Sequence, residues 1–225
     1  FFFFKQKTAY EIQASDWRFR RVLFRSKILI DDEGKEIGRE ATNQYADASF
    51  QRVGSALPKY QGGLTNTLTY KNISLGVQVY FLNGNKVYSN NLRFLMNDGN
   101  EPYYNQIVLP AGYSIWTQPG DVASNPSPQN AANAQEVSTR YLKDGSFLSI
   151  RNISLSYSIP NAIVKRMSMQ QIVLSFSADN VYTFTKFLGQ DPQTTITPDI
   201  YTTPGVSDFK YPNNRQYLFN INIQF

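Results

Sequence analysis

The chain has 225 residues, 22 of them basic and 17 acidic, with a formal net charge of +5. Because cysteine and histidine are both absent, disulfide frameworks, cysteine nucleophiles, histidine-based triads and zinc sites built on these residues are excluded. No run of about 18 apolar residues occurs, so no transmembrane helix is expected. Aromatic residues reach 15% while mean hydropathy is negative, a combination that suits either a membrane β-barrel or a soluble lectin-like sandwich.

The first 26 residues differ in character from the rest of the chain. Residues 21–26 read Arg-Val-Leu-Phe-Arg-Ser, which is what CGT GTG CTC TTC CGA TCT encodes, and they resemble a common sequencing-library adapter. We therefore predict that residues 1–26 are non-native sequence. A signal peptide is the alternative, but its basic residues precede its apolar stretch, whereas here they follow it. Residues 27–225 alone carry 16 basic and 15 acidic side chains, a net charge of +1, so nucleic-acid binding loses its main support.

Residues 27–81 divide into a loop-rich part and a β-hairpin. Residues 27–62 contain many glycines in short polar stretches and are predicted to be mostly loop, with a solvated turn at 31–34. Apolar and polar side chains then alternate along 64–70 and again along 73–81. This period of two predicts two strands joined by a tight turn at Lys71 and Asn72.

A stretch of weak pattern follows, from residue 82 to about 141. Asparagine, glycine, proline and serine dominate it, which predicts a long loop of a kind unusual in compact soluble domains. Short strand signals at 85–88 and 91–95 suggest that the sheet extends partly into this stretch.

Two further strands are predicted in the last third of the chain. Apolar residues in 147–159 change from even to odd positions near Arg151 and Asn152, which indicates a β-bulge. Residues 160–170 have helical spacing and are predicted to form a short helical turn. A strand begins at 172 and runs toward 187, and a second long loop covers about 188–212.

The chain closes on an amphipathic strand at 217–225 that ends in an aromatic residue. Long loops and tight turns alternate before it, which is typical of an up-and-down barrel. We therefore predict an all-β fold, an antiparallel up-and-down transmembrane β-barrel present only as its last several strands with long extracellular loops. The apolar positions of this strand are Tyr217, Phe219, Ile221, Ile223 and Phe225.

Three blocks of sequence point to a known family. Residues 141–160 (YLKDGSFLSIRNISLSYSIP) and 174–192 (LSFSADNVYTFTKFLGQDP) closely resemble the C-terminal region of SusC/RagA-type TonB-dependent outer-membrane transporters. Residues 54–63 (GSALPKYQGG) look like the preceding part, and the resemblance extends over about 30–225. It implies that 27–225 is the C-terminal part of a barrel of about 22 strands, with the signal peptide, plug and TonB-contacting box lying outside this chain.

The resemblance also implies function and partners. Such transporters import glycans, oligosaccharides or peptides across the outer membrane and are not enzymes; their partners are a SusD-like lipoprotein lid, the TonB complex and outer-membrane lipid. The terminal strand resembles the signal that the barrel-assembly machinery reads. No cofactor, metal or catalytic residue is expected, and this fragment alone is not expected to transport anything.

Loop residues offer weaker candidates for a binding site. The aromatics that could contact substrate or lid, or could equally be girdle or loop-packing residues, are Tyr103, Tyr104, Tyr113 and Trp116. Residues 141–148 could make a similar contact, but Asp144 and Gly145 favour a hairpin turn. Asp179 and Asn180 supply too few oxygen ligands for calcium.

Two rival functions use the same strands differently. A secreted β-sandwich carbohydrate-binding module would bury the apolar strand faces against a second sheet, whereas a barrel wall turns them to lipid and carries polar side chains opposite. For the barrel, the opposite-face residues are predicted to include Ser74, Gln78, Asn220 and Asn222. A polysaccharide-cleaving enzyme would need convergent carboxylates on rigid strands, and the strands carry almost none.

Overall fold

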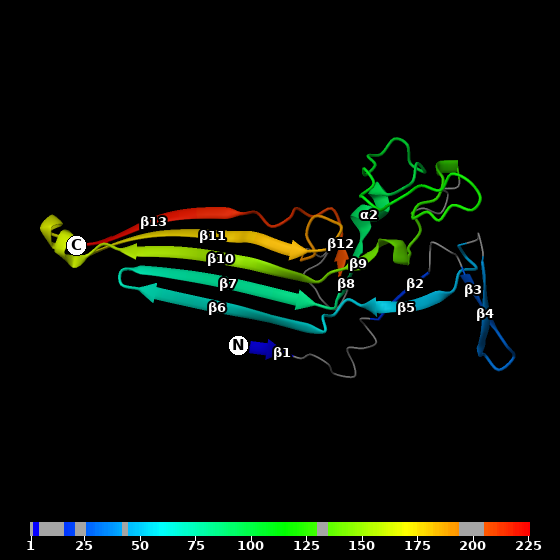
Figure 1. Cartoon of the computed structure of the whole chain (residues 1–225), viewed down its shortest axis with the longest axis horizontal. Coiled ribbons are helices and arrows are strands. Elements are labelled where there is room, and N and C mark those ends of the chain that lie inside the picture. Colours follow the sequence, from blue (N-terminus) through cyan, green and yellow to red (C-terminus); the bar gives the residue numbers. More distant parts are fainter. Residues whose placement is uncertain (1, 5–15, 21–25, 42–44, 130–134, 194–204) are drawn as a thin grey trace.

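A computed structural model of the chain describes residues 2–4, 16–20, 26–41, 45–129, 135–193 and 205–225. Its largest element is a six-stranded antiparallel sheet, called here the main sheet, with the order β1-β6-β7-β10-β11-β13 (Figure 1). In the described residues this sheet is open, with β1 at one edge and β13 at the other. The strands are β1 (Phe2–Phe4), β6 (Tyr60–Tyr70), β7 (Ile73–Asn83), β10 (Phe147–Ser158), β11 (Gln171–Thr185) and β13 (Gln216–Gln224).

The β6–β7 hairpin confirms the predicted tight turn. Tyr70 pairs with Ile73, so Lys71 and Asn72 alone make the connection. Lys71 has a φ of 52°, in the left-handed region that such short turns require. The Asn72 side chain then donates from Nδ2 to the carbonyl of Ser158, 2.8 Å away, which ties the turn to the end of β10.

The bulge predicted near residues 151 and 152 is also confirmed. Between Ile150 and Asn152, β10 advances by two residues while its partner β7 advances by one, which leaves Arg151 as the extra residue. On the other side β11 advances by three residues, and its Asn180 has a φ of 52°. Paired irregularities of this kind explain why the apolar residues of β10 change parity there without leaving their face of the sheet.

A short helical connection joins β10 to β11, as predicted for residues 160–170. It consists of α3 (Asn161–Val164) and the 3-10 helix η3 (Lys165–Met167). The connection ends at Ser168, whose φ of 56° reverses the chain into β11. Among the described residues, no helix has the length and apolar character to cross a membrane.

A smaller folded unit, called here the end module, lies beyond one end of the main sheet (Figure 1). It contains a three-stranded sheet in the order β12-β8-β9 and a cluster of the buried side chains Tyr88, Leu92, Met96 and Tyr141. The cluster is the main core cluster of the described residues. The elements of the end module are β8 (Lys86–Ser89), α2 (Asn90–Leu95), η2 (Thr139–Tyr141), β9 (Leu142–Asp144) and β12 (Val206–Ser207).

Two sequence predictions for this region were wrong. The strand signal at 85–88 does form β8, but β8 pairs with β9 and β12 and does not extend the main sheet. The signal at 91–95 belongs to helix α2. The helix begins here because Ser89 caps it. Ser89 Oγ accepts a hydrogen bond from the Leu92 amide at 3.3 Å, which satisfies a free N–H at the helix start.

The part before β6 is more ordered than predicted. Two local pairs occupy it, β2 with β5 and β3 with β4. β3, β4 and β5 fall almost entirely within 27–62, where mostly loop was expected, and β2 lies in the first 26 residues. The solvated turn at 31–34 is confirmed, because Asp31 Oδ1 accepts from the amides of Glu33 and Lys35 and Gly34 has a φ of 81°. That residues 1–26 are non-native sequence remains a prediction. The strands are β2 (Asp16–Arg20), β3 (Ser26–Ile30), β4 (Glu36–Ala41) and β5 (Phe50–Ser55).

Candidate functional site

One face of the main sheet is apolar across five neighbouring strands. Strand register places these side chains opposite one another, so that Leu68 lies beside Leu75, Leu75 beside Leu155, and Leu155 beside Phe176. Phe176 in turn lies beside Phe219 on the terminal strand. The face includes Leu64, Leu68, Ile73, Leu75, Val77, Val79, Leu148, Ile150, Ile153, Leu155, Leu174, Phe176, Tyr182, Phe184, Tyr217, Phe219, Ile221 and Ile223.

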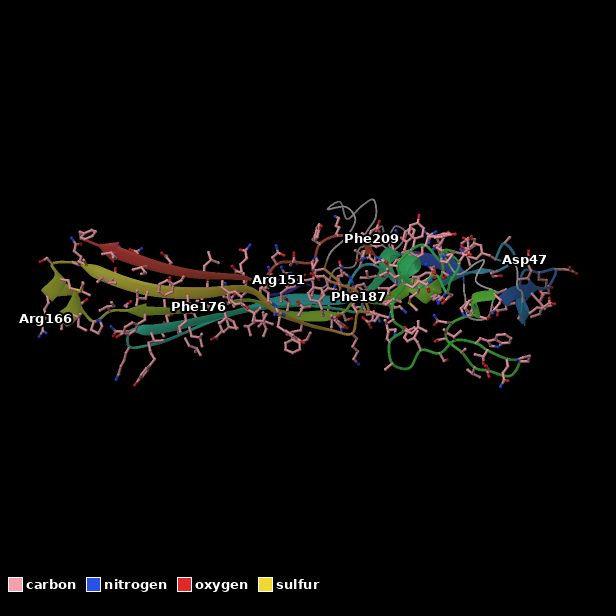
Figure 2. All side chains as sticks on the ribbon, turned by 90° about the horizontal axis from the view of Figure 1, so that it is seen from above. Asp47, Arg151, Arg166, Phe176, Phe187 and Phe209 are labelled. Atoms are coloured by element: carbon pink, nitrogen blue, oxygen red, sulfur yellow. The ribbon has the colours of Figure 1, made fainter. Side chains whose placement is uncertain are left out.

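This apolar face is largely uncovered. Leu68 is 63% exposed, Leu155 46% and Phe219 67%, although each lies in the interior of a strand. Figure 2 shows the main sheet as a thin layer, with Phe176 on a part over which no second layer packs. A continuous exposed apolar surface of this extent is typical of a protein that meets lipid or a partner there.

The opposite face is polar, as predicted. Ser74 lies beside Ser156, and Gln78 beside Asn152, while Asn220 and Asn222 occupy the same face of the terminal strand. Side chains on this face bond to one another, as between Asn152 Nδ2 and Asp179 Oδ1 at 2.6 Å. The main sheet therefore has one apolar and one polar face.

Arg151 marks the bulge on the polar face. Its guanidinium carbon lies 5.0 Å from the centre of the Tyr80 ring, a cation–π contact, and its Nη2 donates to Gln193 Oε1 at 2.7 Å. The Tyr80 hydroxyl donates to Gln61 Oε1 at 3.2 Å. Arg151 Nε is buried and has no hydrogen-bond partner among the residues that the structure describes. Figure 2 places Arg151 where the main sheet approaches the end module.

The loop after β11 folds over the polar face beside Arg151. Gln193 bonds through Nε2 to Thr183 Oγ1, and Thr183 bonds to Ser149 Oγ at 3.2 Å. Asp191 fixes the loop, because its Oδ1 accepts from the Gln193 amide and its Oδ2 from Asn213 Nδ2. A cavity of about 230 Å³ adjoins this loop; its walls include Thr183, Gln193, Asn213 and Arg215.

A buried ion pair fastens the long loop of the end module. Arg140 Nη1 and Nη2 both bond to the carboxylate of Asp98, the second at 2.7 Å, and each side chain is only 5% exposed. Asn125 Nδ2 donates to the same carboxylate. Burial alone would lower the pKa of Arg140, but the hydrogen bonds and charge of Asp98 outweigh it and raise that pKa. Asp98 and Arg140 are 42 residues apart in the sequence, so no local sequence pattern predicts their pairing.

The four predicted loop aromatics differ in burial and in their contacts. Tyr103 is 98% exposed and Tyr104 is also exposed. Tyr113 instead packs against the core of the end module, and its hydroxyl accepts from Lys143 Nζ at 3.2 Å. Trp116 is half-buried, and its backbone N–H donates a hydrogen bond to the carbonyl of Asn125 in the same loop. Contact of any of the four with a substrate or lid remains a prediction.

The block at 141–148 has the structural role that the sequence favoured, but in a different form. Tyr141 is fully buried in the core of the end module. Asp144 and Gly145 do not make a hairpin, because β9 and β10 belong to different sheets. They form the joint between them: Ser146 donates to Asp144 Oδ1, which lowers the pKa of Asp144, and the Gly145 amide donates to the Asn85 carbonyl.

The terminal strand lies where the sequence predicted it. Tyr217, Phe219, Ile221 and Ile223 all face the apolar side through their register with β11, and Phe225 follows the last paired residue and is exposed. Their recognition by an assembly machinery remains a prediction. Within the described ranges, no group of three or more acidic, cysteine or histidine residues could hold a metal ion.

Comparison with known proteins finds similarity to TonB-dependent receptors. The chain is 25% identical over 198 residues to TonB-dependent receptor P3 of Formosa agariphila, and 25% over 211 residues to TonB-dependent receptor P39 of the same organism. These alignments cover 83% and 91% of this chain. The chain is homologous to TonB-dependent receptors. No family model matches.

Solved structures support the same fold. The RagAB peptide importer in its open-open state matches with a TM-score of 0.69 at 21% identity over 93% of this chain, and its closed-closed state with 0.68 over the whole chain. The chain spans only 18% and 19% of the two TonB-dependent receptors and 22% and 23% of the two importer chains. The aligned region therefore corresponds to part of these receptors, in agreement with the family resemblance of the sequence.

Proposed function

We propose that this chain supplies part of the wall and outer loops of an outer-membrane β-barrel that imports nutrients with energy from the TonB complex. The observation that carries the proposal is the uncovered apolar face across five strands with a polar face behind it. Homology to TonB-dependent receptors supports it independently. The carbohydrate-binding sandwich is disfavoured, since no second sheet covers this face among the described residues.

The proposed mechanism follows from the two faces. In hydrocarbon every backbone polar group must be satisfied within the protein, so the open edges of the main sheet would pair with further strands of the same receptor. The apolar face would meet lipid, and the polar face, with Ser74, Gln78 and Asn152, would line the aqueous interior. The end module would lie outside the lipid, because its side chains form a core of their own.

The solved structures that this chain resembles support the proposed cargo and partners. The matched structures are of a peptide importer, RagAB, so peptides, glycans or oligosaccharides are proposed as cargo. A SusD-like lipoprotein would close over the outer loops, with Tyr103 and Tyr104 as exposed candidates for contact. The terminal strand, from Tyr217 to Phe225, would be read by the barrel-assembly machinery through strand pairing.

The test exploits two neighbouring positions of β10 that face opposite sides. In the full-length receptor, Leu155→Arg would place a charge on the proposed lipid face, where it costs about 2–4 kcal/mol near the middle of the bilayer. Ser156→Arg, the matched control, would place the same charge on the polar face. We expect the first variant, but not the second, to be depleted from the outer membrane, measured by heat-modifiable mobility and immunoblotting of membrane fractions.

Two outcomes would contradict the proposal. One is equal recovery of both variants in the outer membrane, which would mean that Leu155 does not face lipid. The other is recovery of the unmodified receptor in the soluble periplasmic fraction without detergent.

The prediction that residues 1–26 are non-native has its own test. Genomic DNA that encodes residues 21–26 in an open frame continuing upstream, without adapter sequence, would show that it is wrong.

A further inference from the structure

Two arginines of this chain, the buried Arg140 and the half-buried Arg151, differ in the groups that face their positive charge. Arg140 is paired with the carboxylate of Asp98 through two hydrogen bonds. Among the described residues, Arg151 has neutral partners, the ring of Tyr80 and the amide oxygen of Gln193, and no carboxylate of this part of the chain forms an ion pair with it. A guanidinium held by an aromatic ring and an amide keeps a positive charge that these described neighbours do not compensate.

The acidic side chains of this part of the sheet bind other groups. Asp191, in the loop that supplies Gln193, accepts hydrogen bonds from the backbone N–H of Gln193 and from Asn213 Nδ2. Asp179, one strand away, accepts from Asn152. Arg151 is nonetheless kept in place, because the Tyr80 ring lies on one side of it and Gln193 is fixed by Thr183. The cation is therefore oriented before any ligand arrives, which lowers the entropic cost of binding.

We propose that Arg151 receives a carboxylate group of the imported cargo. This inference rests on the proposed function, in which the polar face of the main sheet lines the path of the cargo. A carboxylate suits the site because the guanidinium donates in a planar fork that matches two carboxylate oxygens. The half-buried side chain lies on the polar face, and its partner Gln193 lines a cavity of about 230 Å³ whose walls also include Asp191 and Arg215. The carboxylate could belong to the C-terminus of a peptide or to an acidic sugar.

The test compares matched probes with and without the charge. The full-length receptor in detergent is titrated calorimetrically with trialanine and with its C-terminal amide, and separately with trigalacturonate and its methyl ester. We expect the free acid of one pair to bind on the order of tenfold more tightly or better, as a charge-assisted hydrogen bond contributes. The pair that shows the preference identifies the source of the carboxylate.

Variants then assign the preference to Arg151. Arg151→Gln is expected to abolish it and Arg151→Lys to keep part of it, while Arg166→Gln, at the far tip of the main sheet in Figure 2, is expected to leave it unchanged. Gln193→Glu would supply a carboxylate beside Nη2 and should abolish the preference with Arg151 intact. That variant covers the case in which Arg151→Gln does not assemble.

The inference is overturned if neither acid is preferred, or if the preference survives both Arg151→Gln and Gln193→Glu. These results require a receptor that has reached the outer membrane. They are therefore distinct from failure of the proposed function, which appears as equal recovery of Leu155→Arg and Ser156→Arg in the membrane fraction.

Discussion

The main sheet and the end module place the same kinds of side chain in opposite environments. Leu92 in the end module is 2% exposed and packs with Tyr88, Met96 and Tyr141, whereas Leu155 in the main sheet is 46% exposed with a continuous apolar surface around it. The core cluster of the end module is buried by this chain itself, whereas the apolar face of the main sheet is largely left uncovered by the described residues. The difference supports the proposal that the end module lies in water and that the apolar face of the main sheet meets lipid or a partner outside the chain.

Breaking the buried ion pair should have the largest effect on the end module alone. Asp98→Ala would leave Arg140 buried without its counter-charge, which destabilises a fold by about 3–5 kcal/mol. Hydrogen exchange should show loss of protection in α2 and β8 while the main sheet keeps its own. The exposed Asp32→Ala is the control. Equal protection of α2 in the two variants would mean that the pair contributes little.

Truncating matched leucines would sharpen the comparison directly. Leu92→Ala removes side-chain atoms from a packed core and should cost about 2–5 kcal/mol of unfolding free energy. Leu155→Ala should cost much less in detergent, because its side chain faces outward and the detergent can fill the space. Denaturant unfolding of both variants in the same detergent measures the difference, and similar losses would mean that Leu155 is packed as Leu92 is.

The joint between the two regions should respond to one added methyl group. A Cβ on Gly145 would lie 2.5 Å from both Asn85 Nδ2 and Val87 Cγ2, so Gly145→Ala should cost about 1–3 kcal/mol through overpacking. Gly38→Ala, with its nearest neighbour at 3.9 Å, is the matched control. Thermal unfolding followed by circular dichroism tests this; an unchanged midpoint for Gly145→Ala would show that the joint yields easily.

The sequence was more informative about the main sheet than about the end module for a physical reason. A strand between two environments must alternate, so 73–81 and 217–225 could be predicted, and a parity change such as that at Arg151 reveals a bulge. The end module depends on contacts between distant residues, such as Asp98 with Arg140. Helix α2 was misread as a strand because its six residues are too few to show helical periodicity.

In the candidate site, too, the features set by local alternation could be predicted and those set by contacts between distant residues could not. The apolar and polar faces followed from alternation, and the terminal strand with them. Arg151 was recognised only as the position of a parity change, because its partner Gln193 is 42 residues away and Tyr80 lies on another strand. The loop aromatics were chosen by residue type alone, and type does not distinguish the exposed Tyr103 from the packed Tyr113.

Alkaline titration should have the smallest effect, with none at neutral pH. Burial raises the pKa of Tyr141 from its ordinary 10.0 to about 12, and burial raises that of Tyr88 as well. A folded-state pKa above the unfolded one means that the neutral phenol favours the fold: its contribution is complete below pH 10 and is lost as the pH rises toward 12. The end module should therefore loosen in this window before the main sheet does. Phenolate absorbance should show late-titrating groups in the parent protein, and Tyr141→Phe should remove one of them. Loss of a phenol that titrates near pH 10 instead would mean that Tyr141 is open to solvent and that the core of the end module is not closed.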